Sequence, residues 1–283
     1  MACMRDFVTQ GRMTDPGRYA GLFHAVPGDV AGVGRVVQGL LIHEFWADGY
    51  GVTLAEEDRD RVNLRRVEDV LDAVLAKDDR PLTEEREPGS RVATNCRGFS
   101  VLAVAMLRHH GVPARARCGF GAYFKAGYFE DHWVVEYRDG DTWKLFDAQI
   151  DPMQRDIVKI TFDLADVPRD QFVIAGQGWK LVRAGKADPN RFGLSTIDEF
   201  GDWWIAQNLT RDAASLAGIE TLPWDQWGVM PEPGDAIDVE LYDRLAAATA
   251  EPSMSAVTQL MVDERLRIPG EVFNVQHQRK EPV

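Results

Sequence analysis

The spacing of apolar residues changes once along the chain, and this change separates predicted helices from predicted strands. From Asp29 to Ala47, and again from Leu64 to Leu75, apolar residues recur every three or four positions, which is the period of an amphipathic helix. Residues 94–113 contain an almost unbroken apolar run, which predicts a helix surrounded by protein. Apolar residues then alternate from Ala114 to Phe124, as they do in a strand.

The buried helix at 94–113 carries signals at both ends. Thr94 or Asn95 can cap its first turn, because either side-chain oxygen can accept a hydrogen bond from a free backbone N–H. Gly111 supplies the left-handed residue that commonly ends a helix, and Pro113 prevents its continuation. Cys96 is therefore expected in the first turn, where unpaired N–H groups and the helix dipole favour a thiolate.

Three strands are predicted after this helix. The first, at 114–124, has small and aromatic residues on one side and arginines on the other. Residues 132–137 and 143–148 form two more strands, joined by a turn at 138–141 that contains Asp-Gly. A helix followed by an antiparallel meander predicts an α+β fold.

We expect three parts of the chain. Residues 1–88 are predicted to form a mainly helical segment packed on the core, residues 89–185 the core, and residues 186–283 a mainly helical region. Within them, residues 77–90 have the composition of an exposed connection, and residues 152–185 that of short strands or loops.

The C-terminal part carries weaker signals. Ser195 or Thr196 is the expected N-cap of one helix, and a further helix is expected at 235–248. Residues 276–283 are expected to form a charged, disordered tail.

Charge and cysteine content exclude several classes. The formal net charge of −13 argues against nucleic acid or an anionic membrane as a partner. Three cysteines without metal-ligand spacing argue against a disulfide framework and a structural metal, so we expect neither a metal nor another cofactor. No apolar run is long enough for a signal peptide or a membrane span, and a reducing cytoplasm is the expected compartment.

Three side chains with complementary chemistry occur in the order Cys96, His132, Asp147. A thiolate can attack a carbonyl carbon, an imidazole can transfer the proton, and a carboxylate can orient the imidazole. His132 shares a strand face with Glu136, Asp147 shares one with Leu145, and pairing of the two strands would set the two faces side by side.

These residues lie in a pattern that resembles a known family. The chain resembles a bacterial-type member of the transglutaminase-like superfamily of papain-like cysteine enzymes. The resemblance lies in three runs: Asn95-Cys96-Arg97-Gly98-Phe99-Ser100, Asp131-His132-Trp133-Val134-Val135-Glu136 and Trp143-Lys144-Leu145-Phe146-Asp147-Ala148. The resemblance implies a papain/transglutaminase-like core in which Cys96 is the nucleophile, His132 the general acid and base, and Asp147 the orienting carboxylate.

An oxyanion donor is also needed in such a site. The backbone N–H of Cys96 is the natural first donor. Asn95 and Trp133 are weaker candidates for the oxyanion site or the cleft, and Asn95 is equally suited to be the helix cap.

The predicted reaction is acyl transfer through a thioester, with hydrolysis of a peptide or other amide bond ranked first. Amide formation or transamidation to an amine is the alternative, and a non-catalytic peptide- or protein-binding module is the rival from another class. The expected partner is a small-molecule or peptide amide or thioester, with an acyl carrier or another protein as a further option.

Other polar and reactive residues are open to two interpretations. Glu130, Asp131 and Glu136 near His132 favour a cationic or amine-bearing substrate, or form a solvated rim.

Cys118 is interpreted as a small buried apolar residue. His43-Glu44 begins like a zinc-protease motif but lacks the second histidine, so no metal is expected there. The C-terminal tryptophans, at positions 203, 204, 224 and 227, are interpreted as packing residues, with a cleft wall as the alternative.

Overall fold

The computed structural model describes residues 7–283, which form two compact units. Among these residues, the first unit contains the chain up to Ala116 and Val134–Val167, and the second contains Arg117–Trp133 and Pro168–Val283. Strands β3 (Ala114–Gly121) and β4 (Phe129–Asp139) each continue from one unit into the other. The predicted three-part division stays a prediction, and Cys3 lies outside the described residues.

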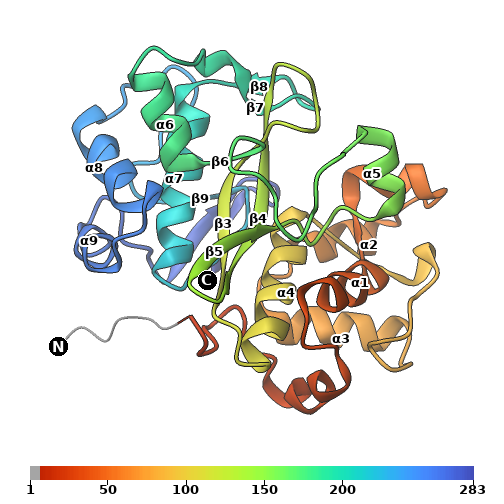
Figure 1. The fold of residues 1–283 in the computed structure, drawn as a ribbon. Helices are drawn as coiled ribbons and strands as arrows, with labels where there is room; N and C mark the ends of the chain where they lie inside the picture. The colour runs from red at the N-terminus through yellow and green to blue at the C-terminus, as the bar shows by residue number, and fades with distance from the viewer. Residues whose placement is uncertain (1–6) are drawn as a thin grey trace. The chain divides into compact units, whose positions relative to one another are not determined.

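Helix α4 (Cys96–His109) of the first unit packs against α1 (Val30–Leu40) and α3 (Val67–Lys77) (Figure 1). All of its residues from Cys96 to Arg108 are buried, which confirms the expectation of a helix surrounded by protein. The other elements of this unit are η1 (Gly17–Ala25), β1 (Leu41–His43), η2 (Glu44–Tyr50), α2 (Glu56–Asp60), η3 (Arg61–Asn63), η4 (Pro88–Ser90), β2 (Val92–Thr94), β5 (Thr142–Phe146) and α5 (Pro152–Val158).

The prediction of one helix from Asp29 to Ala47 is wrong for the second half of that range. The helix ends at Leu40, and β1 follows and pairs in parallel with β2, with His43 opposite Thr94. Leu41 and Ile42 keep the apolar character of the helix, but the backbone hydrogen bonds of residues 41–43 go to a strand about fifty positions away. A local pattern does not contain such a partner, because tertiary pairing overrides propensity.

The second unit contains helices α6 (Ala175–Arg183), α7 (Asp202–Leu216) and α8 (Val239–Ala250), which pack against one another (Figure 1). Its core includes Phe120, Trp179, Phe192, Leu209 and Tyr242. The remaining elements are β6 (Phe172–Ile174), η5 (Pro189–Arg191), β7 (Phe192–Leu194), β8 (Glu199–Phe200), β9 (Asp225–Gln226), α9 (Met254–Leu260), β10 (Glu271–Asn274) and β11 (Arg279–Pro282).

Helix α6 contradicts the expectation of strands or loops across 152–185. Its glycines resemble breakers in the sequence, but they permit close packing in the structure. A Cβ at Gly176 would lie 2.5 Å from Thr249 Oγ1, and a Cβ at Gly178 would lie 3.2 Å from a ring carbon of Phe192. The C-terminal tail is also ordered, since β11 pairs antiparallel with β10.

The helix expected after Ser195 begins later than predicted. Helix α7 starts at Asp202, after Gly201, and β8 occupies part of the expected first turn. The helix expected at 235–248 is present as α8, where Asp238 caps the first turn by accepting a hydrogen bond from the Leu241 N–H.

The sheet order is β6-β3-β4-β7-β8, and β5 pairs antiparallel with β4. The α+β class and the cysteine-bearing helix followed by antiparallel strands are therefore confirmed. Strand β3 is buried on both sides, although its arginines suggested one polar face. Ion pairs explain the difference, because Arg115 pairs with Glu136 in the first unit and Arg117 with Asp212 in the second.

Candidate functional site

Cys96 is the first residue of α4, with 7% of its surface exposed. Asn95 is the N-cap, because its Oδ1 accepts a hydrogen bond of 3.2 Å from the Gly98 N–H, and its Nδ2 donates to the Val62 carbonyl at 3.2 Å. Thr94 presses against this turn, since a Cβ at position 98 would lie 2.0 Å from Thr94 Oγ1. The sulfur atom is thus attached to a fixed helix N-terminus, where an anion is favoured.

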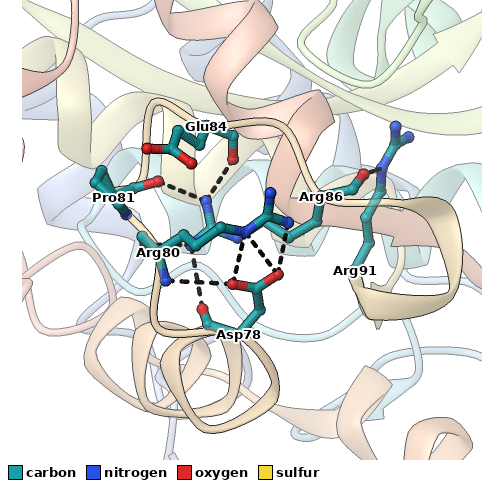
Figure 2. Close-up of polar contacts among 6 residues, drawn as sticks. All are labelled: Asp78, Arg80, Pro81, Glu84, Arg86 and Arg91. Carbon is teal, nitrogen blue, oxygen red and sulfur yellow. Dashed lines mark hydrogen bonds and ion pairs between the residues drawn. The ribbon is translucent and has the colours of Figure 1, made fainter.

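An arginine-organised loop leads the chain toward this turn. The buried Arg86 guanidinium donates to the carbonyl oxygens of Asp78 (3.2 Å), Arg80 (2.6 Å), Pro81 (2.7 Å) and Glu84 (2.5 Å), as Figure 2 shows. Burial lowers the pKa of the guanidinium.

The same loop is linked to strand β2. Arg91 directly precedes β2, and its Nε donates to the Arg86 carbonyl at 3.0 Å (Figure 2). These bonds fix the path of the chain just before β2 and Cys96.

Asp147 lies directly after β5 and is fully buried. Its Oδ1 accepts hydrogen bonds from the backbone N–H groups of Gln149 (3.0 Å) and Ile150 (3.4 Å), and its own N–H donates to the Leu164 carbonyl at 2.9 Å. The sequence had placed this carboxylate in the body of the strand. The strand in fact ends at Phe146, because the side chain of Asp147 binds the backbone of the following turn.

Gln38 of α1 holds the same turn. Its Nε2 donates to the carbonyls of Ala148 at 3.2 Å and Ile150 at 3.1 Å. Helix α1 approaches closely here, since a Cβ at Gly34 would lie 3.0 Å from a ring carbon of Phe146. Gln38 is absent from the predicted site, although an amide within the apolar pattern of α1 is a visible signal in the sequence.

His132 lies inside β4 and is buried, with 2% of its surface exposed. Three aromatic rings of the second unit surround it, with centroid distances of 4.9 Å to Phe124, 6.1 Å to Tyr123 and 6.3 Å to Phe172. The strand begins at Phe129, three residues earlier than expected. Trp133, the next residue, is fully buried, and strand alternation directs it to the opposite face from His132.

Strands β4 and β5 pair antiparallel as expected, with Glu136 opposite Leu145 and Val135 opposite Phe146. The ladder ends at Phe146, so the expected alignment of the His132 and Asp147 faces stays a prediction. The structure brings Cys96 and Asp147 into the first unit, and it assigns His132 to the second. The Cys96, His132 and Asp147 triad, with Asn95 and Trp133 as accessory residues, stays a prediction.

The acidic residues near His132 do not form a solvated rim. Glu130 and Glu136 are buried, with exposed fractions of 5% and 2%. Asp131 accepts a hydrogen bond of 2.7 Å from Trp204 Nε1, and burial raises the pKa of its carboxyl group.

Residues 7–283 include neither a cluster of three potential metal-ligating side chains nor a helix long and apolar enough to cross a membrane. His43 Nδ1 accepts a hydrogen bond from the Phe45 N–H at 3.2 Å.

Cys118 is fully buried, as its position in the alternating strand predicted. Of the four tryptophans, Trp227 is buried and its Nε1 donates to the Leu266 carbonyl at 2.9 Å.

A model of the transglutaminase-like superfamily matches residues 58–148, a segment that contains Cys96, His132 and Asp147. The match agrees with the resemblance that the motifs of this segment predicted. Among solved structures, a candidate cysteine protease from Cytophaga hutchinsonii is similar with 16% sequence identity and a TM-score of 0.34, over 62% of this chain and 46% of that one. No curated protein matches the chain.

Proposed function

We propose that the chain is a cysteine-dependent acyl-transfer enzyme that hydrolyses a peptide or other amide bond. The observation that carries the proposal is the superfamily match, because the matched segment contains Cys96, His132 and Asp147, which are a nucleophile, a base and a carboxylate. The position of Cys96 at the capped N-terminus of α4 supports the role of nucleophile.

His132 and Asp147 are both buried, and Asp147 directly follows β5. In the proposal, the carboxylate of Asp147 orients the imidazole of His132.

The proposed reaction has two steps. The Cys96 thiolate attacks the carbonyl carbon, the C–N bond breaks, and His132 protonates the leaving amine. Water then attacks the thioester carbon after giving a proton to His132, which releases the carboxylic acid and restores the thiol. An amine in place of water would give amide formation, the alternative that uses the same residues. The cytoplasmic location and an acyl-carrier or protein partner belong to the proposal as well.

The test measures alkylation of each cysteine by iodoacetamide as a function of pH, read by peptide mass mapping, in the wild-type protein and in His132→Ala. We expect Cys96 to react well below pH ~8, the range of an ordinary thiol, and to lose this reactivity in the variant. Cys118, which is fully buried, is the internal control and should react slowly in both proteins. An ordinary pH profile that His132→Ala leaves unchanged would favour the non-catalytic binding module.

A second experiment separates water from an amine as the acceptor. The protein is incubated with a peptide library in the presence and absence of a primary amine, and products are identified by mass. Shortened peptides in both samples support hydrolysis. Amine adducts without hydrolysis would overturn the ranking.

A further inference from the structure

Glu130 occupies a special position on strand β4. It precedes His132 by two residues, so the two side chains lie on the same face of the strand, with Cα atoms about 7 Å apart. Glu130 pairs with Gly193 of β7 in the parallel ladder. Only 5% of its surface is exposed.

The two carboxylate oxygens of Glu130 differ in their partners. Oε2 accepts a hydrogen bond of 2.9 Å from the Ser195 N–H. Oε1 is buried and has no hydrogen-bond partner among residues 7–283. A buried carboxylate that accepts one neutral N–H is poorly compensated, because ionised oxygens together accept about four hydrogen bonds and burial removes water.

The neighbouring charged groups among residues 7–283 do not supply the missing donor. Asp131, next on the strand, is bound to Trp204. Two cationic side chains of the same unit, Lys125 and Arg191, lie over the ring of Tyr128, at 4.2 Å and 4.8 Å from its centroid. The open oxygen therefore remains a strong acceptor beside the His132 face.

The surroundings of His132 fit an organic cation. The rings of Phe124, Tyr123 and Phe172 border the imidazole. Aromatic faces attract a cation and shield it from water, and a carboxylate gives it a charge-assisted hydrogen bond. An anionic ligand would meet a negative oxygen here instead.

We propose that Glu130 binds a primary ammonium group of the substrate, next to His132. The assignment of the bound group to the substrate rests on the proposed function, whereas ammonium binding does not. An ammonium held by a carboxylate keeps its proton and is not the attacking nucleophile. The ligand is thus an acyl donor with a cationic side group, or an acceptor that carries a second amine.

The direct test is a binding titration with n-butylammonium chloride, with n-butanol as the uncharged analogue of the same shape. The full-length protein carries ¹³C-labelled histidine, and the His132 signal, assigned with His132→Ala, is followed by NMR. We expect saturable shifts with the ammonium and binding weaker by about tenfold or more with the alcohol, since a charge-assisted bond is lost.

Glu130→Gln provides the matched variant, because its amide oxygen can still accept from the Ser195 N–H. It should weaken ammonium binding about tenfold and leave butanol binding unchanged. Glu199→Gln, on β8 of the same unit, removes the same charge elsewhere and should bind like the wild-type protein. Glu130→Asp keeps the charge but shortens the side chain, so its ammonium affinity should lie between those of the wild-type protein and Glu130→Gln.

Three results would overturn the proposal: no saturable shift of His132 with the ammonium, equal binding of the alcohol, or wild-type affinity in Glu130→Gln. Any of them would mean that Glu130 does not bind an ammonium group. None requires a reactive cysteine, so the outcome is independent of the alkylation test of the proposed function.

A second arm identifies which substrate carries the ammonium. Cys96 is acylated with p-nitrophenyl acetate, which transfers the acetyl group to sulfur and releases p-nitrophenolate. Butane-1,4-diamine is then added. Its free amine would attack the thioester carbon, form the N-acetyl amide, return the thiol and lose its proton to His132.

Saturable amide formation that Glu130→Gln weakens assigns the ammonium to the acceptor. Competitive inhibition of acylation by n-butylammonium, without amide formation, assigns it to the acyl donor. If the protein is acylated but shows neither effect, the assignment of the ammonium group to the substrate is overturned.

Discussion

Glu130 and Glu136 are the same residue type on the same strand and the same strand face, yet they have different surroundings. Glu136 Oε2 accepts a hydrogen bond of 2.8 Å from Arg115 Nε and forms an ion pair with Arg115 Nη2 at 2.8 Å. The Arg115 guanidinium lies over the rings of Phe7 and Trp143, at 4.8 Å and 4.2 Å. Glu130 has one backbone N–H and one open oxygen.

The difference separates a carboxylate with a charged partner from one with an open oxygen. Burial alone does not make the distinction, because both residues are almost fully buried. The kind of donor does make it, because Glu136 is paired with an arginine side chain and Glu130 accepts one backbone N–H. A carboxylate paired with a buried cation should matter for stability, and a carboxylate with an open oxygen should matter for binding.

The largest expected effect is therefore at Glu136. Glu136→Leu leaves the Arg115 charge buried without its partner, which should lower the free energy of unfolding by about 3–5 kcal/mol. Urea denaturation followed by circular dichroism measures the change.

The control is the double variant Arg115→Met/Glu136→Leu, which removes both charges and should recover a large part of the loss. A loss below about 1 kcal/mol in the single variant, the range of exposed ion pairs, would mean that the pair is not structural.

Local signals explain what the sequence could predict. The cap at Asn95 and the left-handed Gly111, with φ of +77°, fix the ends of α4, and both are encoded within a few residues. The Asp-Gly turn sets the register of β4 against β5. The identities and order of Cys96, His132 and Asp147 followed from motifs of the same short range.

What the sequence could not predict depends on distant partners. Strand β1 exists because β2 lies beside it, and the glycines of α6 are explained by Thr249 and Phe192. Gln38 and the Asp147 turn are separated by more than a hundred residues. The three acidic residues near His132 looked alike for the same reason, since only the fold assigns a donor to each.

Glu44 extends the comparison to a carboxylate whose burial dominates its titration. Burial raises its pKa from 4.5 to about 7, and the charge of Arg59 only partly opposes this. The folded state therefore holds the proton more tightly than the unfolded chain. The protonated carboxyl group of Glu44 therefore contributes its full stabilisation of the folded state below pH 4.5, and this contribution is lost as the pH rises through about 7.

Glu44→Gln should remove this pH dependence. We expect the free energy of unfolding of the variant to exceed that of the wild-type protein by about 3 kcal/mol at pH 8 and to be nearly equal at pH 4, since each pKa unit corresponds to about 1.4 kcal/mol. Urea denaturation at the two pH values tests this. Glu56→Gln, at an exposed position of α2, is the control and should change stability by less than about 0.5 kcal/mol at either pH. Equal effects of Glu44→Gln at both pH values would contradict the sign.

The smallest expected effect on stability is at Glu130, although it is as buried as Glu136. Glu130→Gln keeps an acceptor for the Ser195 N–H and removes a charge that the fold leaves half compensated, so the free energy of unfolding should change by less than about 1 kcal/mol in either direction. The same urea titration measures it at pH 7. A loss comparable to that of Glu136→Leu would place Glu130 among the structural carboxylates, because its open oxygen would then have to be satisfied in the folded protein itself. A small change together with weakened ammonium binding would locate its contribution in recognition.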